Sequence, residues 1–427
     1  MVQQSGELGL ETRRLPKGNR NSAACLSRAL FLSPFRSLYT EEVGRSKEQR
    51  WLSESSVPQR FAGCDPFKFL LRLEGGAVRE TARTPGAFRE AIFFTSAMAP
   101  TRWGIVAAGR ICNDFADCIN NMPREEHQVV AVAGRDWENA KRFGELHRIA
   151  RVYATYEELS RDPDVDVAYV GSLHPDHYPT MKLLLEHGKH VLCEKPLTMN
   201  SRDTEEICLL AKEKKLFLME ALWSRFLPSY KHVEEAIKTG AIGDVRYVHS
   251  TFGYPMGSLS RVFRKDCGGS VLLTLGSYTA NLVLQAFGGE RPVKISAYGE
   301  LAPEGVDQAD AVVMEFSGGR LATFALSGVV KLPGRGEIVG TKGTITLHPP
   351  FHATTCVETP SGKFEMQLPP TTVPHNFPNT AAMRYEAEEV RRCLQEGLLE
   401  SPTMTHKDSM LIAEMLDEIL KQVGVKH

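Results

Sequence analysis

The sequence predicts an α/β protein in two parts: a parallel sheet with helices on both faces, then an α+β domain with an open, mainly antiparallel sheet. Between residues 102 and 220, short apolar runs alternate with amphipathic helical segments, which is the pattern of a parallel sheet. Between residues 244 and 347, apolar runs follow one another with few helical segments between them, which favours antiparallel pairing. Residues 1–97 show neither pattern.

The first part is expected to alternate strands and helices. Its strands are short apolar runs, as is typical of parallel strands that are buried on both faces. Strands are expected at 103–106, 128–133, 166–170, 190–193 and 217–220. Helices are expected from the first turn to about 122, and at 138–147, 156–160, 177–187 and 201–213, the last with Ser201 as its N-cap.

The second part is expected to begin with a helix at 229–239 and to continue as a series of strands. The first of these, 244–252, alternates apolar and polar residues, which indicates one buried and one exposed face. The remaining strands are expected at 293–298, 311–316, 320–329, 336–340 and 344–347, and helices at 381–394 and 407–423. Helices would cover one face of this sheet and leave the other free to form a dimer.

Residues 1–97 are expected to be a poorly ordered extension, because they lack the apolar periodicity of a packed domain. Two other interpretations stay open: an Arg- and Ser-rich organelle transit peptide, which Glu7 and Glu11 argue against, or upstream sequence that is not normally translated. Met98 leads directly into the first strand. The predicted domains are therefore 98–222 and 223–427, after the extension.

Composition excludes several classes of protein. Lys and Arg number 51 against 52 Asp and Glu, so the chain lacks the basic balance expected of a nucleic-acid binder. We expect no membrane span, because no apolar run approaches the roughly 18 residues required. The nine cysteines include no Cys-x-x-Cys pair, so no zinc site and no disulfide framework are expected. Reduced thiols favour a cytoplasmic location, and a transit peptide would instead imply mitochondria.

The turn after the first strand is where a parallel sheet of this kind binds a dinucleotide pyrophosphate, through backbone N–H groups and a helix N-terminus. Here the turn reads Ala107, Ala108, Gly109, Arg110 and Ile111. Gly109 takes the central glycine position, while Ala107 and Ile111 replace the flanking glycines. Ala107 still permits a tight turn with slightly less room. This is the pattern of a Rossmann dinucleotide-binding domain.

The end of the second strand predicts which dinucleotide is bound. Arg135 follows Gly134 there and is well placed to meet the 2′-phosphate of NADP. Two alternatives stay open: Asp136 could instead bind the ribose hydroxyl of NAD, and Arg135 could be a solvated surface residue. The predicted cofactor is NADP.

Three further segments carry a resemblance to a known family. They are Gly171 to His177, the run Cys193-Glu194-Lys195-Pro196, and the pair Gly268-Gly269-Ser270 and Gly276-Ser277-Tyr278. With the opening turn, they resemble the glucose–fructose oxidoreductase and inositol dehydrogenase (Gfo/Idh/MocA) family over about residues 101–425. The run from Met219 to Phe226 resembles the branch of dihydrodiol and D-xylose dehydrogenases.

That resemblance implies an NADP-dependent oxidoreductase that acts on the CH–OH group of a small molecule, either a sugar such as D-xylose or a cyclic trans-diol. It also implies a homodimer formed through the second sheet, and C-terminal helices that pack back on the first domain. The implied catalytic residues are Lys195, aimed at the nicotinamide and the reacting hydroxyl, and Tyr278, which exchanges the hydroxyl proton. A nearby Lys ammonium is expected to lower the phenol pKa from its usual value of about 10.

The remaining expected site residues are contacts to the cofactor or the substrate. Cofactor contacts are expected from Ser172, Leu173, His174, His177 and Glu194, and substrate contacts from Trp223, Arg225, Phe252 and Thr274. Thr274 is a departure, because the family usually has an aspartate there, one helical turn before the Tyr. That loss keeps a second hypothesis open: a non-catalytic NADP-binding sensor or interaction scaffold on the same fold.

Overall fold

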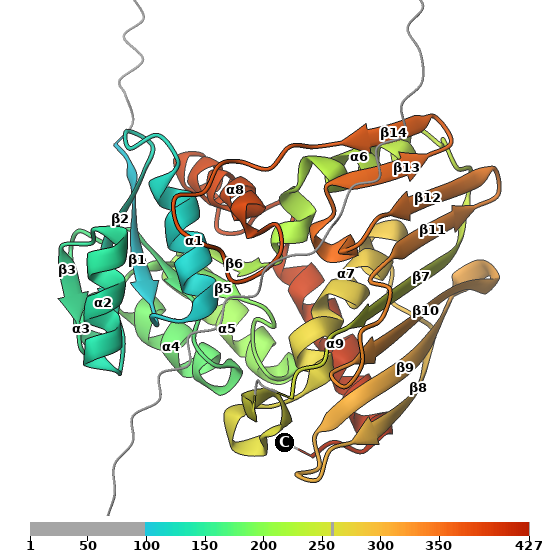
Figure 1. Ribbon diagram of the computed structural model, residues 1–427, viewed down its shortest axis with the longest axis horizontal. Helices are drawn as coiled ribbons and strands as arrows, with labels where there is room; N and C mark the ends of the chain where they lie inside the picture. Colours follow the sequence, from blue (N-terminus) through green and yellow to red (C-terminus); the bar gives the residue numbers. More distant parts are fainter. Residues whose placement is uncertain (1–98, 258–259, 427) are drawn as a thin grey trace, which may run out of the picture. The chain divides into compact units, whose positions relative to one another are not determined.

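The computed structural model describes residues 99–257 and 260–426, which all belong to one compact unit, 89–427. The prediction of a poorly ordered extension at 1–97 concerns residues outside this described part. Within it, the predicted fold class is confirmed: a parallel sheet with helices on both faces is followed by a larger, mainly antiparallel sheet (Figure 1).

The first sheet has six parallel strands in the order β3-β2-β1-β4-β5-β6. The strands are β1 Thr101–Val106, β2 His127–Ala133, β3 Arg151–Tyr153, β4 Val167–Val170, β5 His190–Glu194 and β6 Leu218–Ala221. The helices are α1 Arg110–Asn120, α2 Trp137–His147, α3 Tyr156–Ser160, α4 His174–Glu186 and α5 Ser201–Lys214. Strand order reverses between β1 and β4, so a crevice for a ligand opens at their carboxyl ends.

Two local details differ from the expectations. Strand β3 was not predicted, because its three residues are all half-buried and give no apolar run. The N-cap of α5 is Asn200, whose side chain accepts from the Asp203 N–H, and Ser201 is the first helical residue. An Asn side chain fills the capping position as well as Ser does.

The second sheet has eight strands in the order β14-β13-β12-β11-β7-β10-β9-β8. All neighbours pair antiparallel except β7 and β10, which are parallel. The strands are β7 Val245–Gly253, β8 Lys294–Leu301, β9 Asp307–Phe316, β10 Arg320–Ser327, β11 Gly336–Gly340, β12 Gly343–Leu347, β13 Cys356–Thr359 and β14 Gly362–Glu365. The last two were not predicted.

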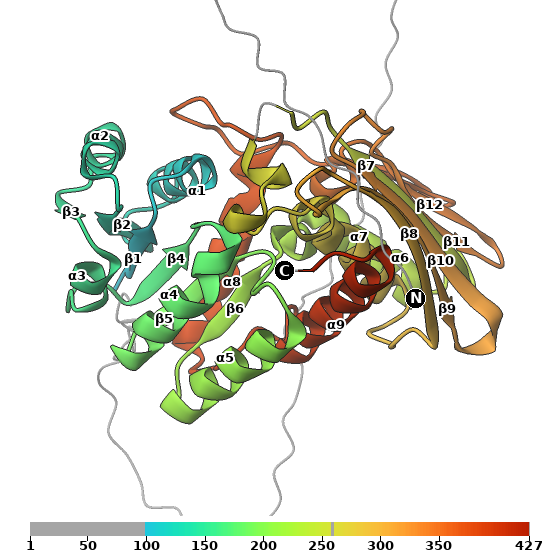
Figure 2. The ribbon, with the colours of Figure 1, turned by 90° about the horizontal axis from the view of Figure 1, so that it is seen from below.

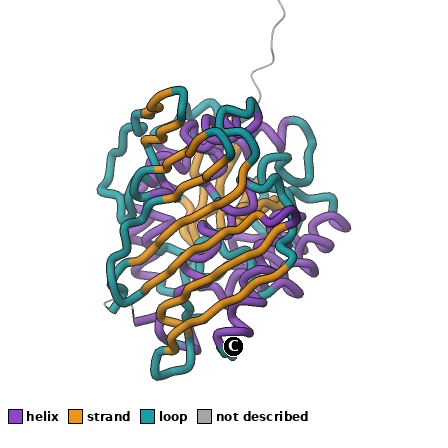
Figure 3. The backbone as a smooth tube through the Cα atoms, turned by 90° about the vertical axis from the view of Figure 1, so that its right-hand side faces the viewer, coloured by secondary structure: helices purple, strands orange, loops and turns teal. Residues whose placement is uncertain are grey.

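Helices cover one face of this sheet and join it to the first part. They are α6 Pro228–Lys238, α7 Ser277–Ala286, α8 Arg384–Gln395 and α9 His406–Val423. Helix α9 contacts β8 and α7 on one side and α5 on the other, and α8 contacts α1 (Figure 2). The opposite face of the eight-stranded sheet carries no helix in the described part of the chain (Figure 3).

One buried segment is as apolar as a membrane-spanning helix. Residues 265–286 are long and apolar enough to cross a membrane by length and composition, but 89% of the tested window is buried inside the protein. A buried core helix passes the same test, and this segment ends in the π-helical turn Leu272–Gly276 and helix α7, which packs against β7 of the second sheet. The seven cysteines of the described residues are all free thiols.

Candidate active site

The turn between β1 and α1 fits a pyrophosphate. Gly109 is the N-cap of α1 without a side-chain cap, and the first turn of the helix has no acidic residue, so its N–H groups suit an anion. A Cβ on Gly109 would meet nothing closer than the Gly171 carbonyl, at 3.7 Å, so packing does not require glycine there. Ala107 has φ +76°, a conformation that costs a residue with a Cβ roughly 1–2 kcal/mol. Such strain is typical of ligand-binding turns.

Arg135 lies at the end of β2, as predicted, and forms an ion pair that was not predicted. Its guanidinium contacts the Asp176 carboxylate at 2.6 Å, and the Tyr156 ring lies beneath it. Asp136, the alternative reader of the ribose, accepts from the Asn139 N–H and caps α2. Arg135 is therefore the freer of the two to face a ligand, and its side chain is 62% exposed.

The loop after β4 is tied to the bend after β5. His177 is buried, and its two ring nitrogens contact the carbonyl oxygens of Pro196, at 2.9 Å, and Ser172, at 3.2 Å. Burial lowers the His177 pKa, so the neutral ring donates to one of these oxygens. His177 thus holds the cis Lys195–Pro196 bend in place, whereas the sequence predicted a cofactor contact.

The other residues of that loop divide between two surroundings. Ser172 and Leu173 lie at the start of α4, and Leu173 is its N-cap residue. The His174 ring stands 5.8 Å from that of His177 and lines a cavity of about 450 Å³ beside α4, α5 and α9. That cavity is lined by neither Lys195 nor Tyr278, so it is separate from the catalytic candidates.

Lys195 projects from the end of β5 toward the second part of the chain. Its Nζ donates to the Thr274 carbonyl at 2.5 Å and lies 5.1 Å from the centroid of the Tyr278 ring. Burial lowers the Lys195 pKa to about 8, against the opposing charge of Glu194. Glu194 itself is buried and accepts from the Tyr169 hydroxyl at 2.6 Å. The Glu194 carboxylate therefore faces the core, whereas the sequence predicted that it would contact the cofactor.

Tyr278 lies in the first turn of α7, directly after a π-helical turn, Leu272–Gly276. Its hydroxyl accepts from Trp223 Nε1 at 3.0 Å. The expected direction of its pKa shift is wrong: burial raises the Tyr278 pKa well above 10, and the negative charge of Glu194 adds to that rise. The Lys195 ammonium lies over the ring and makes no hydrogen bond to the phenol oxygen, so it does not offset the burial.

Aromatic side chains surround Tyr278 and form with it what we call the aromatic cluster. It contains two predicted substrate residues, Trp223 and Phe252, together with His352, which was not predicted. His352 stacks on Phe252 at 4.3 Å between ring centroids and tilts over Tyr278 at 4.7 Å. It comes from a short helical turn, Phe351–Ala353, beyond the predicted strands, and a lone His there gave no signal in the sequence.

Two predicted substrate contacts are engaged elsewhere. The Thr274 hydroxyl donates to the Ser270 carbonyl at 2.6 Å, within its own helical turn. Arg225 is buried and points toward the start of α9, where it contacts Asp408 at 2.9 Å and donates to Asn281 at 2.5 Å. The prediction for Arg225 is wrong in this structure, because its guanidinium joins α7 to α9 instead of facing Tyr278.

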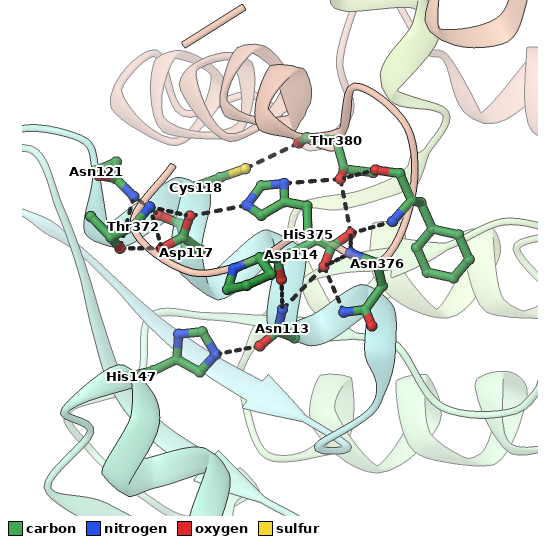
Figure 4. Close-up of polar contacts among 12 residues, drawn as sticks. Asn113, Asp114, Asp117, Cys118, Asn121, His147, Thr372, His375, Asn376 and Thr380 are labelled. Carbon is green, nitrogen blue, oxygen red and sulfur yellow. Dashed lines mark hydrogen bonds and ion pairs between the residues drawn. The ribbon is translucent and has the colours of Figure 1, made fainter. Parts of the chain in front are cut away.

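A segment of the second part crosses α1, and we call it the strap, residues 372–380. Two fully buried aspartates of α1 hold it (Figure 4). Asp114 accepts from the N–H groups of Asn376, at 2.9 Å, and Phe377, at 3.0 Å, and Asp117 accepts from His375 Nε2 at 3.0 Å. These contacts could not be predicted from the sequence, since the partners are more than 250 residues apart.

The strap also reaches the pyrophosphate turn. Asn376 accepts from Arg110 Nε at 3.3 Å and donates to the Arg110 carbonyl at 3.1 Å. The Arg110 guanidinium lies 4.9 Å from the centroid of the Phe377 ring. The predicted cofactor residues 107–111 thus form a turn whose rim is supported from the second part.

The chain therefore brings a Lys ammonium and a Tyr hydroxyl together at the carboxyl end of the first sheet. Such a pair can hold a substrate oxygen and exchange its proton. The strained turn, the uncapped start of α1 and the exposed Arg135 fit a nicotinamide dinucleotide. Among the described residues, no group of three or more His, Cys, Asp or Glu side chains is arranged for a metal.

Comparison with known proteins agrees with this geometry. Residues 101–222 match the model of an oxidoreductase family with an NAD-binding Rossmann fold, and residues 230–346 match the GFO/IDH/MocA C-terminal domain. The chain is 43% identical over 327 residues to trans-1,2-dihydrobenzene-1,2-diol dehydrogenase of Xenopus laevis, covering 77% of this chain and 99% of that protein. Identity to the Homo sapiens protein of the same name is 39%, over 76% of this chain and 97% of that one.

Solved structures share the fold at lower identity. A levoglucosan dehydrogenase in complex with NADH and levoglucosan has a TM-score of 0.66 at 18% identity, covering 76% of this chain and 97% of that one. A 3-ketoreductase from Actinomadura kijaniata in complex with NADP has a TM-score of 0.63 at 23% identity, covering 76% and 98%.

Proposed function

Because the chain belongs to the GFO/IDH/MocA family of oxidoreductases, we propose that it is an NADP-dependent dehydrogenase that oxidises the CH–OH group of a sugar or a cyclic trans-diol. The observation that carries the proposal is the placement of Lys195 Nζ over the Tyr278 ring, 5.1 Å from its centroid. D-Xylose and trans-dihydrodiols are the proposed substrates. The dehydrogenase names of the relatives support the reaction type.

In the proposed reaction, NADP held by the turn Ala107 to Ile111 and by Arg135 would supply the hydride acceptor for oxidation of the carbinol carbon to a carbonyl. Lys195 and Tyr278 hold the substrate oxygen between them. The hydroxyl proton leaves through this pair. Tyr278 exchanges that proton, and the Lys195 ammonium, whose pKa burial lowers to about 8, stabilises the negative charge that develops on the substrate oxygen.

The choice of NADP over NAD rests on Arg135. Its exposed guanidinium stands at the end of β2, where the 2′-phosphate of a dinucleotide would lie, while Asp136 is engaged as a helix cap. The residues proposed to contact the dinucleotide are the turn Ala107 to Ile111, Arg135, and the start of α4 at Ser172 and Leu173.

A homodimer through the second sheet is proposed for the chain. The uncovered face of β8, β9 and β10 carries large apolar side chains, with Tyr298 81% exposed and Val313 and Leu321 beside it. Exposed apolar side chains on an uncovered sheet face favour a protein–protein contact there. Sedimentation velocity of the full chain and of Tyr298→Asp tests this, with the variant expected to be monomeric.

We further propose that the working enzyme is residues 98–427, divided at about 222, and that it is cytoplasmic. The free thiols of the described residues support a reducing compartment. The family match that begins at residue 101, with relatives that match about three quarters of this chain and nearly all of their own length, supports the boundary at 98. A chain that begins at Met98 is expected to bind NADP as tightly as the full chain.

The test of function is a spectrophotometric assay of NADPH formation with D-xylose and with a cyclic trans-diol, using Lys195→Met as the control. Turnover by the wild type and not by the variant supports the dehydrogenase. The loss of the family aspartate at Thr274 favours a second candidate, a sensor or scaffold that binds NADP without turnover. NADP binding by calorimetry without turnover on any sugar or diol would favour that candidate.

A further inference from the structure

His352 is the only member of the aromatic cluster with an imidazole, and neither ring nitrogen has a hydrogen-bond partner among the described residues. The residue is 7% exposed, and its Nδ1 is among the fully buried polar atoms left without a partner. An unpaired polar atom in such a position costs free energy of about 1–3 kcal/mol. A group of this kind in a substrate site requires an explanation.

The ring is held firmly, although its nitrogens are free. Its backbone carbonyl accepts from the Ser224 hydroxyl at 2.5 Å, and the next carbonyl, of Ala353, accepts from the Asn379 side chain at 2.8 Å. Phe252 stacks against one face of the imidazole. His352 is therefore fixed beside Tyr278, with its centroid 4.7 Å from the phenol ring.

The charge state of this imidazole is also fixed. Burial lowers the His352 pKa to about 3, and the nearby Lys195 ammonium contributes to that lowering. The ring is consequently neutral at physiological pH. A neutral imidazole offers one N–H donor and one acceptor, which is the set that a substrate hydroxyl needs.

Thr274 explains why such a group is needed in this chain. Thr274 has no carboxylate, its hydroxyl donates to the Ser270 carbonyl, and its own carbonyl accepts from Lys195. Its side chain therefore offers no free group to bind a second substrate hydroxyl. His352, by contrast, lies against the Tyr278 ring, with 4.7 Å between the ring centroids.

We propose that His352 hydrogen-bonds the hydroxyl adjacent to the reacting carbon of a vicinal diol, and so selects vicinal diols and sugars over simple alcohols. The proposal rests on the dehydrogenase function and names the substrate class of that same site. Its neutral imidazole takes the place of the carboxylate that Thr274 lacks. A phenylalanine at position 352 would keep an aromatic ring in the cluster but would have no nitrogen to hydrogen-bond the second hydroxyl.

The experiment compares a matched pair of substrates, trans-cyclohexane-1,2-diol and cyclohexanol, with the full chain and NADP. His352→Phe keeps an aromatic ring and removes both nitrogens. It is expected to raise KM for the diol roughly tenfold, the loss of one or two hydrogen bonds, while the kinetics with cyclohexanol change by less than about twofold. His352→Gln, which retains a donor and an acceptor, should recover part of the loss.

The control is His232→Phe, an α6 histidine stacked on Phe364 away from the cluster, which should leave both substrates unchanged. A second readout does not need turnover: quenching of Trp223 fluorescence on titration of the diol into the NADP-loaded chain. If the wild type turned over neither substrate, the proposed function would fail, and this titration would still decide the role of His352. Equal diol affinity in wild type and His352→Phe, or equal losses for diol and cyclohexanol, would overturn the assignment.

Discussion

Lys195 Nζ donates a 2.5 Å hydrogen bond to the backbone carbonyl of Thr274, the residue that stands where the family resemblance predicts an aspartate. The backbone thus supplies an acceptor that a side chain would otherwise provide. The carbonyl belongs to a π-helical turn, and such turns are common at functional sites. It keeps the ammonium at the Tyr278 ring without adding a full negative charge to the site.

The catalytic pair is expected to act as one unit. Tyr278→Phe removes the only hydroxyl of that ring, and turnover should fall by roughly 10²–10⁴ with NADP affinity nearly unchanged. Lys195→Met should cost at least as much, and the double variant little more than the lysine variant alone. Steady-state kinetics and calorimetry measure the two quantities. Wild-type turnover by Tyr278→Phe over the whole pH range would remove the tyrosine from the mechanism.

The pH profile should report Lys195. Because burial lowers its pKa to about 8, the ammonium that holds the substrate oxygen is lost above that pH, and kcat/KM should fall. Lys195→Arg keeps the charge, so its residual activity should lack this alkaline limb. Thr274→Asp places a carboxylate beside the ammonium and should move the limb to higher pH. An unshifted limb in both variants would assign it to another group.

Arg135 and Asp176 should tune cofactor choice in opposite directions. Arg135→Ala removes the phosphate contact and should weaken NADP by about one to two orders of magnitude, with NAD nearly unchanged. Asp176→Asn frees the guanidinium from its exposed ion pair, worth about 0.2–1 kcal/mol, and should tighten NADP by a factor of about 1.4 to 5. Titration of both dinucleotides checks this, and equal losses for NADP and NAD in Arg135→Ala would contradict it.

Asp310 should make the protein less stable at high pH. It is buried in β9 next to the Asp307 carboxyl, and burial, reinforced by that neighbouring acid, raises the Asp310 pKa to about 9. The unfolded carboxyl ionises near pH 4. Stability is therefore lost as pH rises from about 4 through the folded value, since the folded state holds the extra proton. Asp310→Asn should melt higher than the wild type at pH 8, and the gain should shrink toward pH 4.

The stability gained by Asp310→Asn at pH 8 depends on how far the structure around the wild-type carboxylate relaxes when it is charged. Each kcal/mol of added unfolding free energy raises Tm by about 2–4 °C in a protein of this size. Asp244→Asn, on an exposed turn before β7, is the matched control and should melt like the wild type at both pH values. A difference between Asp310→Asn and the wild type that did not change with pH would show that folding leaves the Asp310 pKa unchanged.

Features encoded by neighbouring residues could be predicted from the sequence. Gly109, Arg135 and Lys195 each follow an apolar strand, so strand order alone brings them to one edge of the sheet. The departure at Thr274 was visible for the same reason. Residue type and spacing were enough to predict these positions, because each depends only on the residues next to it in the sequence.

Features that depend on distant partners could not be predicted. Arg225 lies two residues from Trp223, yet its guanidinium turns to Asp408 at the start of α9. His352 reaches the site from a turn that no periodicity marks. The Tyr278 pKa was expected to fall because charge alone was considered, whereas burial dominates and raises it.

The strap has a consequence for how the polypeptide can be divided. A cut near residue 222 would separate Asp114 and Asp117 from the segment that satisfies them, leaving two carboxylates that the intact protein buries. Neither fragment should then be soluble and native by itself, since each would expose the surface that the other covers. Expressed together as 98–222 and 223–427, the fragments should find each other and restore NADP binding. We therefore expect the two sequence domains to fold together as one cooperative unit.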